Sequence, residues 1–147
     1  LMPTNLYGPF DNFSENDSHV IPGLIAKMHK AKEQKAKEFK IWGTGKPLRE
    51  FLYVDDLSRA IEYLIFNKPE ESLLNIGSGI EITIYDLAKK IKEVVEFEGQ
   101  LDFDSTKPDG NPRKLLDSST INKLGWSPEV NLDNGLRLTY KWYLNNL

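Results

Sequence analysis

Hydrophobic positions along the chain follow two spacings, one typical of helices and one typical of strands. The clearest helix has apolar residues at positions 84, 87, 88, 91, 94 and 95, which places them on one helical face. Thr83 precedes it and can cap its first turn, with Asp86 three residues further on. The same spacing predicts helices that begin near residues 19, 55, 118 and 132, with Ser18 as the cap of the first.

Short apolar and β-branched runs between these helices predict strands at residues 39–42, 49–54, 72–76 and 100–103. The turn of residues 43–47 separates the first two strands, and we interpret the three segments as a hairpin. Residues 3–13 and 105–114 are rich in Pro, Asn, Gly and Asp, a composition typical of loops. Strands that alternate with helices indicate the α/β class, here a small sheet with surrounding helices because the strands are few and short.

The length of 147 residues is about that of one domain, and the chain has no internal repeat and no long Pro/Gly/Ser linker. The absence of cysteine excludes a disulfide framework and any thiolate metal site or thiol nucleophile from this chain. No His/Asp/Glu cluster has metal-ligand spacing, and no apolar run approaches the roughly 18–20 residues of a membrane-spanning helix. The sequence begins Leu1-Met2 with no signal peptide, which suggests the back part of a longer protein.

The net charge of −3 conceals a lysine-rich stretch. Residues 27–40 contain six lysines and two glutamates, a local charge of +4. Because the stretch has no arginine and only Phe39 as an aromatic residue, it favours a solvated helix end over nucleic-acid binding. His29 lies among these lysines and is also expected to be solvated.

Two features in the first half of the chain could carry chemistry. His19 lies in the first turn of its helix, where backbone N–H groups favour anions and a histidine can donate a proton near neutral pH. A lone histidine is more often structural. Trp42 and Arg49 offer an indole for stacking on a base and a guanidinium for a phosphate. The alternative is a core tryptophan and an arginine on a sheet edge.

Two loops are further candidates. Asn75–Gly79 is glycine-rich after a strand, but it lacks the dinucleotide fingerprint and the P-loop lysine, so a plain strand-to-helix turn is the better interpretation. Residues 107–114 place three cations and one carboxylate on a loop that two prolines stiffen. Such a loop loses less entropy when it orders around a ligand. It is equally compatible with a binding loop and a solvated turn.

Six stretches occur together in an order found in one known family. They are Pro3–Pro9, Asn16–Pro22, Trp42–Gly45, Arg49–Asp56, Asn75–Gly79 and Lys107–Asp117. Together they resemble the GDP-L-fucose synthases, a branch of the extended short-chain dehydrogenase/reductase superfamily, over essentially the whole chain. The second and the last stretch are narrow to this branch, whereas Arg49–Asp56 and Asn75–Gly79 recur among nucleotide-sugar epimerases and dehydratases.

The resemblance implies a cytoplasmic NADPH-dependent oxidoreductase and isomerase. It epimerises GDP-4-keto-6-deoxy-D-mannose at C3 and C5 and reduces C4. His19 matches the catalytic acid and lies at the NADP site. The residues that match the loop along the nicotinamide end of NADP are Pro3, Thr4, Asn5 and Leu6. The residues that match contacts to the substrate are Lys27, Trp42, Arg49, Asp109 and Lys114. Lys27 stands where the family usually has arginine, so it keeps a cation and loses the planar fork.

The resemblance also implies parts that these residues lack. The glycine-rich NADP fingerprint, the Ser-Tyr-Lys set and the cysteine base belong to the family's front half. We therefore expect residues 1–147 to be a C-terminal substrate-binding region without its Rossmann half, and to be inactive alone. Residues 1–18 form the cofactor-side loop, and the elements of 55–80 pack on the Rossmann half. Without that half, exposed apolar faces favour self-association into a homo-oligomer.

Two other hypotheses stay open. The chain could belong to another nucleotide-sugar epimerase or dehydratase, which a comparison of GDP, UDP and dTDP binding would separate. It could also be a non-enzymatic nucleotide-sugar binding module that reuses the substrate domain.

Overall fold

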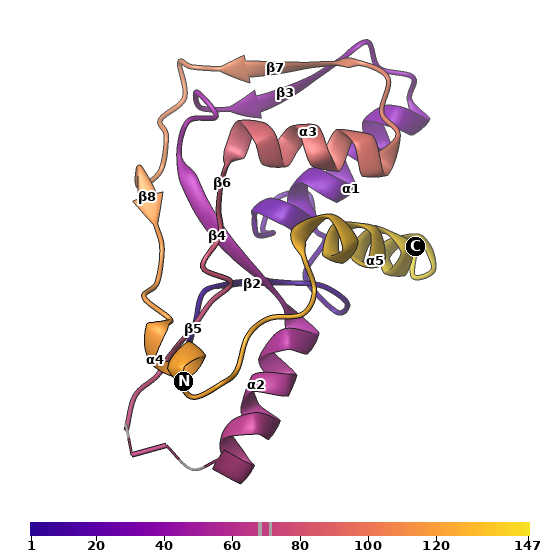
Figure 1. Cartoon of the computed structure of the whole chain (residues 1–147). Coiled ribbons are helices and arrows are strands. Elements are labelled where there is room, and N and C mark those ends of the chain that lie inside the picture. The colour runs from indigo at the N-terminus through magenta and orange to yellow at the C-terminus, as the bar shows by residue number, and fades with distance from the viewer. Residues whose placement is uncertain (68, 71) are drawn as a thin grey trace.

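The computed structural model describes residues 1–67, 69–70 and 72–147, which form a mixed α/β fold (Figure 1). The helices are α1 (Val20–Glu33), α2 (Val54–Asn67), α3 (Ile84–Val95), α4 (Ser119–Lys123) and α5 (Leu132–Leu144). The strands are β1 (Met2–Pro3), β2 (Asn5–Tyr7), β3 (Glu38–Trp42), β4 (Leu48–Tyr53), β5 (Asn75–Ile76), β6 (Glu81–Thr83), β7 (Gln100–Asp104) and β8 (Arg113–Lys114). The predicted α/β class is confirmed.

Strand β4 connects most of the sheet structure. Its second half pairs in parallel with β2, with Leu52 opposite Leu6. Its first half pairs with β6 in antiparallel and with β8 in parallel orientation, so that Arg49 lies opposite both Ile82 and Lys114. The strands β1 and β5 form a separate parallel pair. Three segments that are distant in sequence, β2, β6 and β8, therefore pair with one strand.

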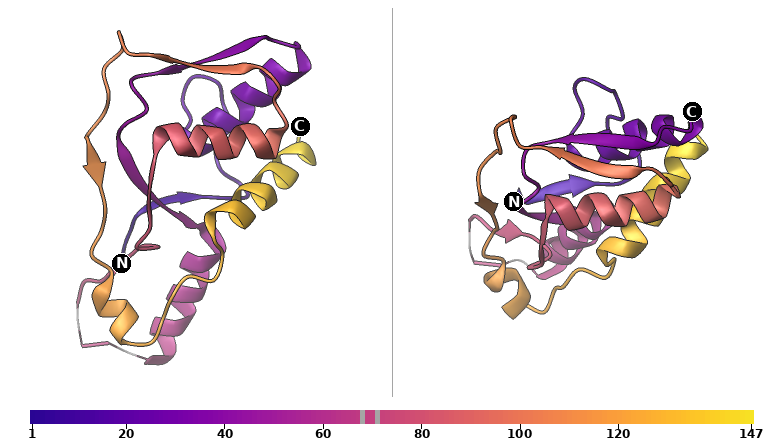
Figure 2. Two further views of the ribbon diagram at one scale, coloured as in Figure 1. Left: turned by 45° about the horizontal axis from the view of Figure 1, so that its top comes forward. Right: turned by 90° about the horizontal axis from the view of Figure 1, so that it is seen from above.

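The predicted hairpin of residues 39–54 is wrong. β3 pairs in parallel with β7 over five residues, from Glu38 opposite Gln100 to Trp42 opposite Asp104, and the two strands run side by side in Figure 2. Gly43 and Gly45 adopt φ values of 86° and 75°, a left-handed conformation that glycine reaches without steric cost. These two residues turn the chain out of one sheet and into another.

The loop predicted for residues 3–13 is wrong where β1 and β2 form, and Tyr7 of β2 is only 2% exposed. The predicted strand 72–76 shortens to the two residues of β5. β6 and β8 have no signal in the sequence. Strands of two or three residues carry too little pattern of their own, and they exist here because a neighbouring strand supplies their hydrogen bonds.

The larger hydrophobic core lies between α1, α3 and α5, which gather in the upper part of Figure 1. Its fully buried members include Ile25 and Met28 of α1, Leu87 and Ile91 of α3, and Leu136 of α5. The helical spacing read from residues 84–95 is confirmed, with Thr83 as the N-cap that accepts the Asp86 N–H at 3.0 Å. We call this cluster the upper core.

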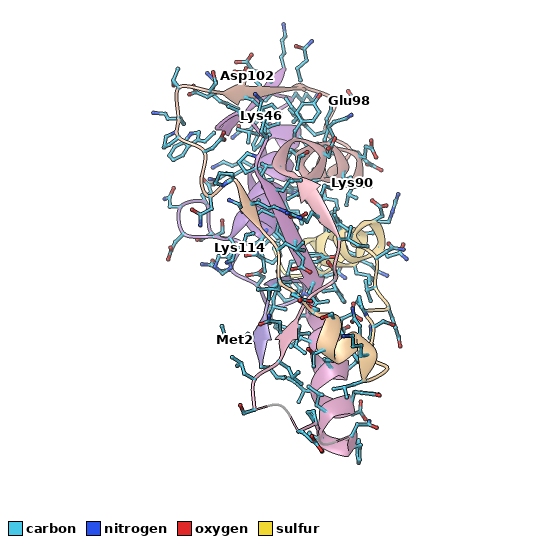
Figure 3. All side chains as sticks on the ribbon, turned by 60° about the vertical axis from the view of Figure 1, so that its left-hand side comes forward. Met2, Lys46, Lys90, Glu98, Asp102 and Lys114 are labelled. Carbon is cyan, nitrogen blue, oxygen red and sulfur yellow. The ribbon has the colours of Figure 1, made fainter. Side chains whose placement is uncertain are left out.

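A second, smaller cluster lies below it, between α2, α4 and β5. Its buried members are Leu52, Ala60, Ile76, Ile121 and Trp126. We call it the lower core. On the outer side of α2, Ile65 and Phe66 are 62% and 79% exposed. Figure 3 shows Met2 at this lower end of the molecule, far from Asp102 at the upper end.

The first helix begins differently from the prediction. Its N-cap is His19, in an extended conformation, and no side chain caps α1, so the capping role predicted for Ser18 is wrong. The Ser18 hydroxyl instead lies against Gly23, where an added Cβ would come within 2.4 Å of its oxygen. The one-residue shift leaves the His19 imidazole outside the helix, at its positively polarised end.

Candidate functional site

Two cavities meet at the N-terminus of α1. The first, of about 550 Å³, lies between α1, the end of β3, the start of β4 and the loop 108–110; we call it the indole cavity because Trp42 lines it. The second, of about 800 Å³, is lined by residues 4–11, the start of α1 and β4; we call it the N-terminal cavity. Both volumes suit small-molecule ligands. The residues that line both cavities are Ser18, His19, Val20 and Arg49.

His19 occupies the junction between the two cavities. Its backbone carbonyl accepts the Gly23 N–H at 2.9 Å, which anchors the residue to the first turn of α1. Its side chain is exposed and caps no helix N–H. The imidazole is therefore available to a ligand from either cavity, and it can act as a proton donor or acceptor there.

Arg49 reaches the same junction from β4. The side chain is half-buried, and its Nη1 donates a hydrogen bond to the Leu48 carbonyl at 2.8 Å. The other guanidinium nitrogen lies beside the loop, since a Cβ added to Gly110 would come within 3.1 Å of Nη2. This placement points a planar set of donors at the space between the two cavities, where it can bind a phosphate or carboxylate in bidentate fashion.

Trp42 is not a core residue, because its side chain is 74% exposed at the end of β3. The Lys107 ammonium lies 5.7 Å from the centroid of its ring, within the range of a cation–π contact. Lys27, exposed on α1, lines the same cavity. The indole cavity thus offers one aromatic face and several cations.

Asp109 closes the loop onto the turn that follows β3. Its two carboxylate oxygens accept hydrogen bonds from the Thr44 N–H at 2.8 Å and from the Thr44 hydroxyl at 2.7 Å. Hydrogen bonds from the hydroxyl and the backbone of Thr44 hold the pKa of Asp109 below its usual value. The Leu48 N–H also bonds to the Pro112 carbonyl at 2.9 Å. The loop is therefore held as a wall of the cavity, and its contact with a ligand stays a prediction.

Two of the sequence-predicted site residues lie outside both cavities. Lys114 is exposed on β8, opposite Arg49 in the strand pairing, and Figure 3 shows it at the side of the molecule. Pro3 belongs to β1 and contributes to neither lining, whereas Thr4, Asn5 and Leu6 line the N-terminal cavity. For Lys114 and Pro3 a ligand contact stays a prediction.

The expected solvation of His29 is wrong. Its side chain is 12% exposed, its Nδ1 lies 2.9 Å from the Tyr140 hydroxyl, and its ring packs edge-on against Tyr140 and Tyr143. The reason is that α1 turns this position toward α5, while the lysines of the stretch point outward. Three of those lysines pair with acidic residues of other segments: Lys30 with Glu15, Lys32 with Glu96 and Lys40 with Asp102.

Within the described part of the chain, no group of three His, Asp or Glu residues could hold a metal ion. None of the helices described there has the length and apolar character that crossing a membrane requires.

The sequence matches the family model "NAD dependent epimerase/dehydratase family" over residues 1–77, more than half of its length. The chain belongs to this family. It is similar to a probable GDP-L-fucose synthase 1 of Oryza sativa subsp. japonica, with 56% identity over 146 residues that cover 99% of this chain and 44% of the relative. The GDP-L-fucose synthase of Escherichia coli is 45% identical over 155 residues, 99% of this chain and 48% of the relative.

A solved structure gives the same result. A GDP-L-fucose synthetase from Naegleria fowleri bound to NADP superposes with a TM-score of 0.93 and 33% identity, over 99% of this chain and 46% of that one. A UDP-glucose 4-epimerase from Thermotoga maritima superposes with a TM-score of 0.80 and 27% identity, over 98% and 45%. The predicted resemblance to GDP-L-fucose synthases is confirmed. The chain spans about half the length of the curated relatives it matches.

In this family member the structure adds two residues that sequence reasoning missed, Glu50 and Asp56, both fully buried. Asp56 accepts the N–H groups of Glu129 and Val130 at 2.8 and 3.1 Å and also binds Arg59. One signal in the sequence could have found them: a carboxylate that lies among apolar residues on a predicted strand or helix face. Ionised side chains are almost never fully buried without partners, so such a carboxylate indicates a buried hydrogen-bond site. Both residues lie in the Arg49–Asp56 stretch.

Proposed function

We propose that the chain is the substrate-binding part of a GDP-L-fucose synthase, which converts GDP-4-keto-6-deoxy-D-mannose by epimerisation at C3 and C5 and reduction at C4. One observation carries this proposal: the indole cavity brings His19, Lys27, Trp42, Arg49 and Asp109 together from four separate segments. They are the catalytic acid and four of the five substrate contacts that the family resemblance implies.

The chemistry of the cavity suits a nucleoside diphosphate. A flat base can stack on the exposed indole of Trp42. The Arg49 guanidinium and the Lys27 ammonium supply positive charge for two phosphates. Because a lysine binds as a point charge, Lys27 attracts a phosphate without fixing its orientation, and Arg49 is the residue that sets the geometry.

His19 is proposed as the acid of the epimerisation. Because His19 lines both cavities, its imidazole can reach a sugar in the indole cavity as well as the cavity proposed for the cofactor. Protonation of a sugar carbon requires a donor within hydrogen-bond reach on one face of the ring. The opposing base is the family's cysteine, which this chain does not contain.

The N-terminal cavity is proposed as the place where the nicotinamide end of NADP lies. Thr4, Asn5 and Leu6 line it together with His19, and Asn5 is held by a 2.8 Å bond from its amide to the Glu50 carbonyl. A cavity with one wall of strand backbone and one helix N-terminus fits a flat, partly polar ring. When bound, NADPH supplies the hydride for the reduction at C4.

We also propose that residues 55–80 pack on a Rossmann half and that the 147 residues alone bind substrate without turning it over. The exposure of Ile65, Phe66 and Leu73 supports the packing surface, as does the coverage of only half the length of the relatives. A cytoplasmic location rests on the family likeness, and a homo-oligomeric state rests on these exposed apolar side chains. Cell fractionation tests the first and sedimentation analysis tests the second.

Titration calorimetry of the chain with GDP, UDP and dTDP tests the function. We expect GDP to bind at least about tenfold more tightly than UDP or dTDP. Trp42→Ala and Arg49→Gln should each weaken GDP binding by about tenfold. Glu62 is exposed on α2 and lines neither cavity, so Glu62→Gln should leave GDP binding unchanged. The absence of GDP binding at about 5 mM would rule the proposed function out.

A second candidate is a related nucleotide-sugar epimerase, favoured by the structural similarity to the UDP-glucose 4-epimerase. Preferential binding of UDP by the same cavity would select it.

Activity is tested separately: NADPH-dependent formation of GDP-fucose by the chain would contradict the proposed inactivity. In the full-length enzyme, unchanged turnover after His19→Gln would remove His19 from the mechanism.

A further inference from the structure

Glu50 is a charged side chain at the centre of the fold that the proposed chemistry does not use. It is fully buried on β4, directly after Arg49. Its Oε1 accepts the Gly79 N–H at 2.7 Å and its Oε2 accepts the Leu116 N–H at 3.1 Å. Among the described residues, Glu50 forms no ion pair. Two backbone donors therefore compensate for the burial of this carboxylate, an arrangement that is costly to disturb.

The surroundings of Glu50 are built around the carboxylate. A Cβ added to Gly77 would lie 2.3 Å from Oε1, so the close approach of this turn requires glycine. The Gly77–Gly79 turn, interpreted from the sequence as a plain connection, thus forms one side of the Glu50 pocket. On the other side, the backbone carbonyl of Glu50 accepts the Asn5 amide at 2.8 Å and the Thr4 hydroxyl at 3.3 Å.

The segments held by Glu50 border both cavities. Thr4 and Asn5 line the N-terminal cavity. Leu116 lies just after β8, the strand that pairs with β4 at Arg49. The loop that carries Asp109 leads directly into β8. Successive side chains of a strand point to opposite faces, so Glu50 anchors β4 from the face opposite to the one on which Arg49 enters the cavities.

We propose that Glu50 is a positioning residue for Arg49, holding its guanidinium at the junction of the two cavities by tying β4 to the turn at Gly79, the segment at Leu116 and the loop at Thr4–Asn5. Glu50 touches no ligand itself. The inference rests on the proposed function, because its effect is read through the diphosphate that Arg49 is proposed to bind.

Glu50→Gln tests the proposal with nearly unchanged side-chain volume. The amide presents an NH2 group to one of two N–H donors, so one of the two bonds is lost. GDP binding should weaken by about tenfold, and binding of guanosine, which has no phosphate, by less than about twofold. Combined with Arg49→Gln, Glu50→Gln should cause no further loss, because two residues that act through one contact are non-additive. Glu62→Gln is the control.

The outcomes separate the inference from the proposed function. If the unmodified chain does not bind GDP, the proposed function fails and the inference with it. If the chain binds GDP but Glu50→Gln weakens GDP and guanosine by the same factor, or adds fully to Arg49→Gln, Glu50 is merely structural and only the inference is wrong.

A second variant covers the case in which circular dichroism shows Glu50→Gln to be unfolded. Asn5→Leu removes the 2.8 Å bond to the Glu50 carbonyl from a half-buried position and leaves the carboxylate in place. We expect GDP to bind about fivefold more weakly, again without additivity to Arg49→Gln. Unchanged GDP binding by this variant would refute the proposal.

Discussion

The helix α3 of the upper core and the helix α2 of the lower core have the same kind of amphipathic spacing, yet their apolar side chains are buried to different extents. In α3 the residues Leu87, Ala88, Ile91 and Val95 are all fully buried against α1 and α5. In α2 only Ala60 is fully buried among the apolar residues, Leu57 and Leu64 are half-buried against the lower core, and Ile65 is 62% exposed. Spacing therefore shows which side chains share a face, and only the neighbouring elements determine whether that face is covered.

The largest expected effect separates the two cores directly. Ile91→Ala leaves a cavity in the upper core and should lower the free energy of unfolding by about 2–4 kcal/mol. The matched change on α2, Ile65→Ala, should cost less than about 0.5 kcal/mol because that side chain is mostly in water. Denaturant titration followed by circular dichroism measures both. Equal losses would show that α2 is covered in solution.

A second test concerns the carboxylate that joins the lower core to the segment before α5. Asp56→Asn places an NH2 group where the N–H groups of Glu129 and Val130 need acceptors, and should cost about 1–3 kcal/mol. The neighbouring Asp55 is exposed, so Asp55→Asn should cost less than about 0.5 kcal/mol. If the two variants unfold at the same denaturant concentration, Asp56 has no anchoring role.

The upper core should also respond to alkaline pH. Burial raises the pKa of Tyr7 above its usual value, so the folded state favours the neutral phenol. Its contribution to stability is complete below the unfolded pKa of about 10 and is lost as pH rises beyond it, by up to about 1.4 kcal/mol per pH unit. Tyr7→Phe should reduce this loss, and the more exposed Tyr85→Phe should not. Unfolding curves at pH 9 to 11 (about the range of tyrosine titration) decide it.

The smallest effect on folding is expected on the exposed face of α2. Replacing Ile65 and Phe66 by lysine should change the free energy of unfolding by less than about 0.5 kcal/mol, since both side chains are mostly exposed. The same change should abolish any self-association of the chain, measured by sedimentation velocity. If this variant still self-associates, copies of the chain contact each other through a surface other than this face of α2.

Helices were predictable because their signal is local. The expected start of α5 near residue 132 agrees with the structure, and Thr83 caps α3 as expected, since spacing and capping need only neighbouring residues. The short strands β1, β2, β6 and β8 were not predictable, because their pairing partners lie far away in sequence. The same holds for the environment of His29, which depends on Tyr140 and Tyr143 of another helix.

The candidate site also has a part that the sequence predicts and a part that depends on contacts between distant segments. Motif order was enough to single out His19, Trp42, Arg49 and Asp109 and to connect them with a family. Their meeting in one cavity, and the separation of Lys114 from it, follow from the way the segments pair along β4 and fold beside it.

By itself the sequence determined the α/β class, the helices and the residue types that suit a nucleotide sugar. Those features follow from local periodicity and from the chemistry of single side chains. The tertiary structure decided which faces are covered, which loops form walls and which charges are buried. A buried carboxylate such as Glu50 shows the reason: it is tolerable only where two distant N–H groups converge on it, and that convergence exists only in the fold.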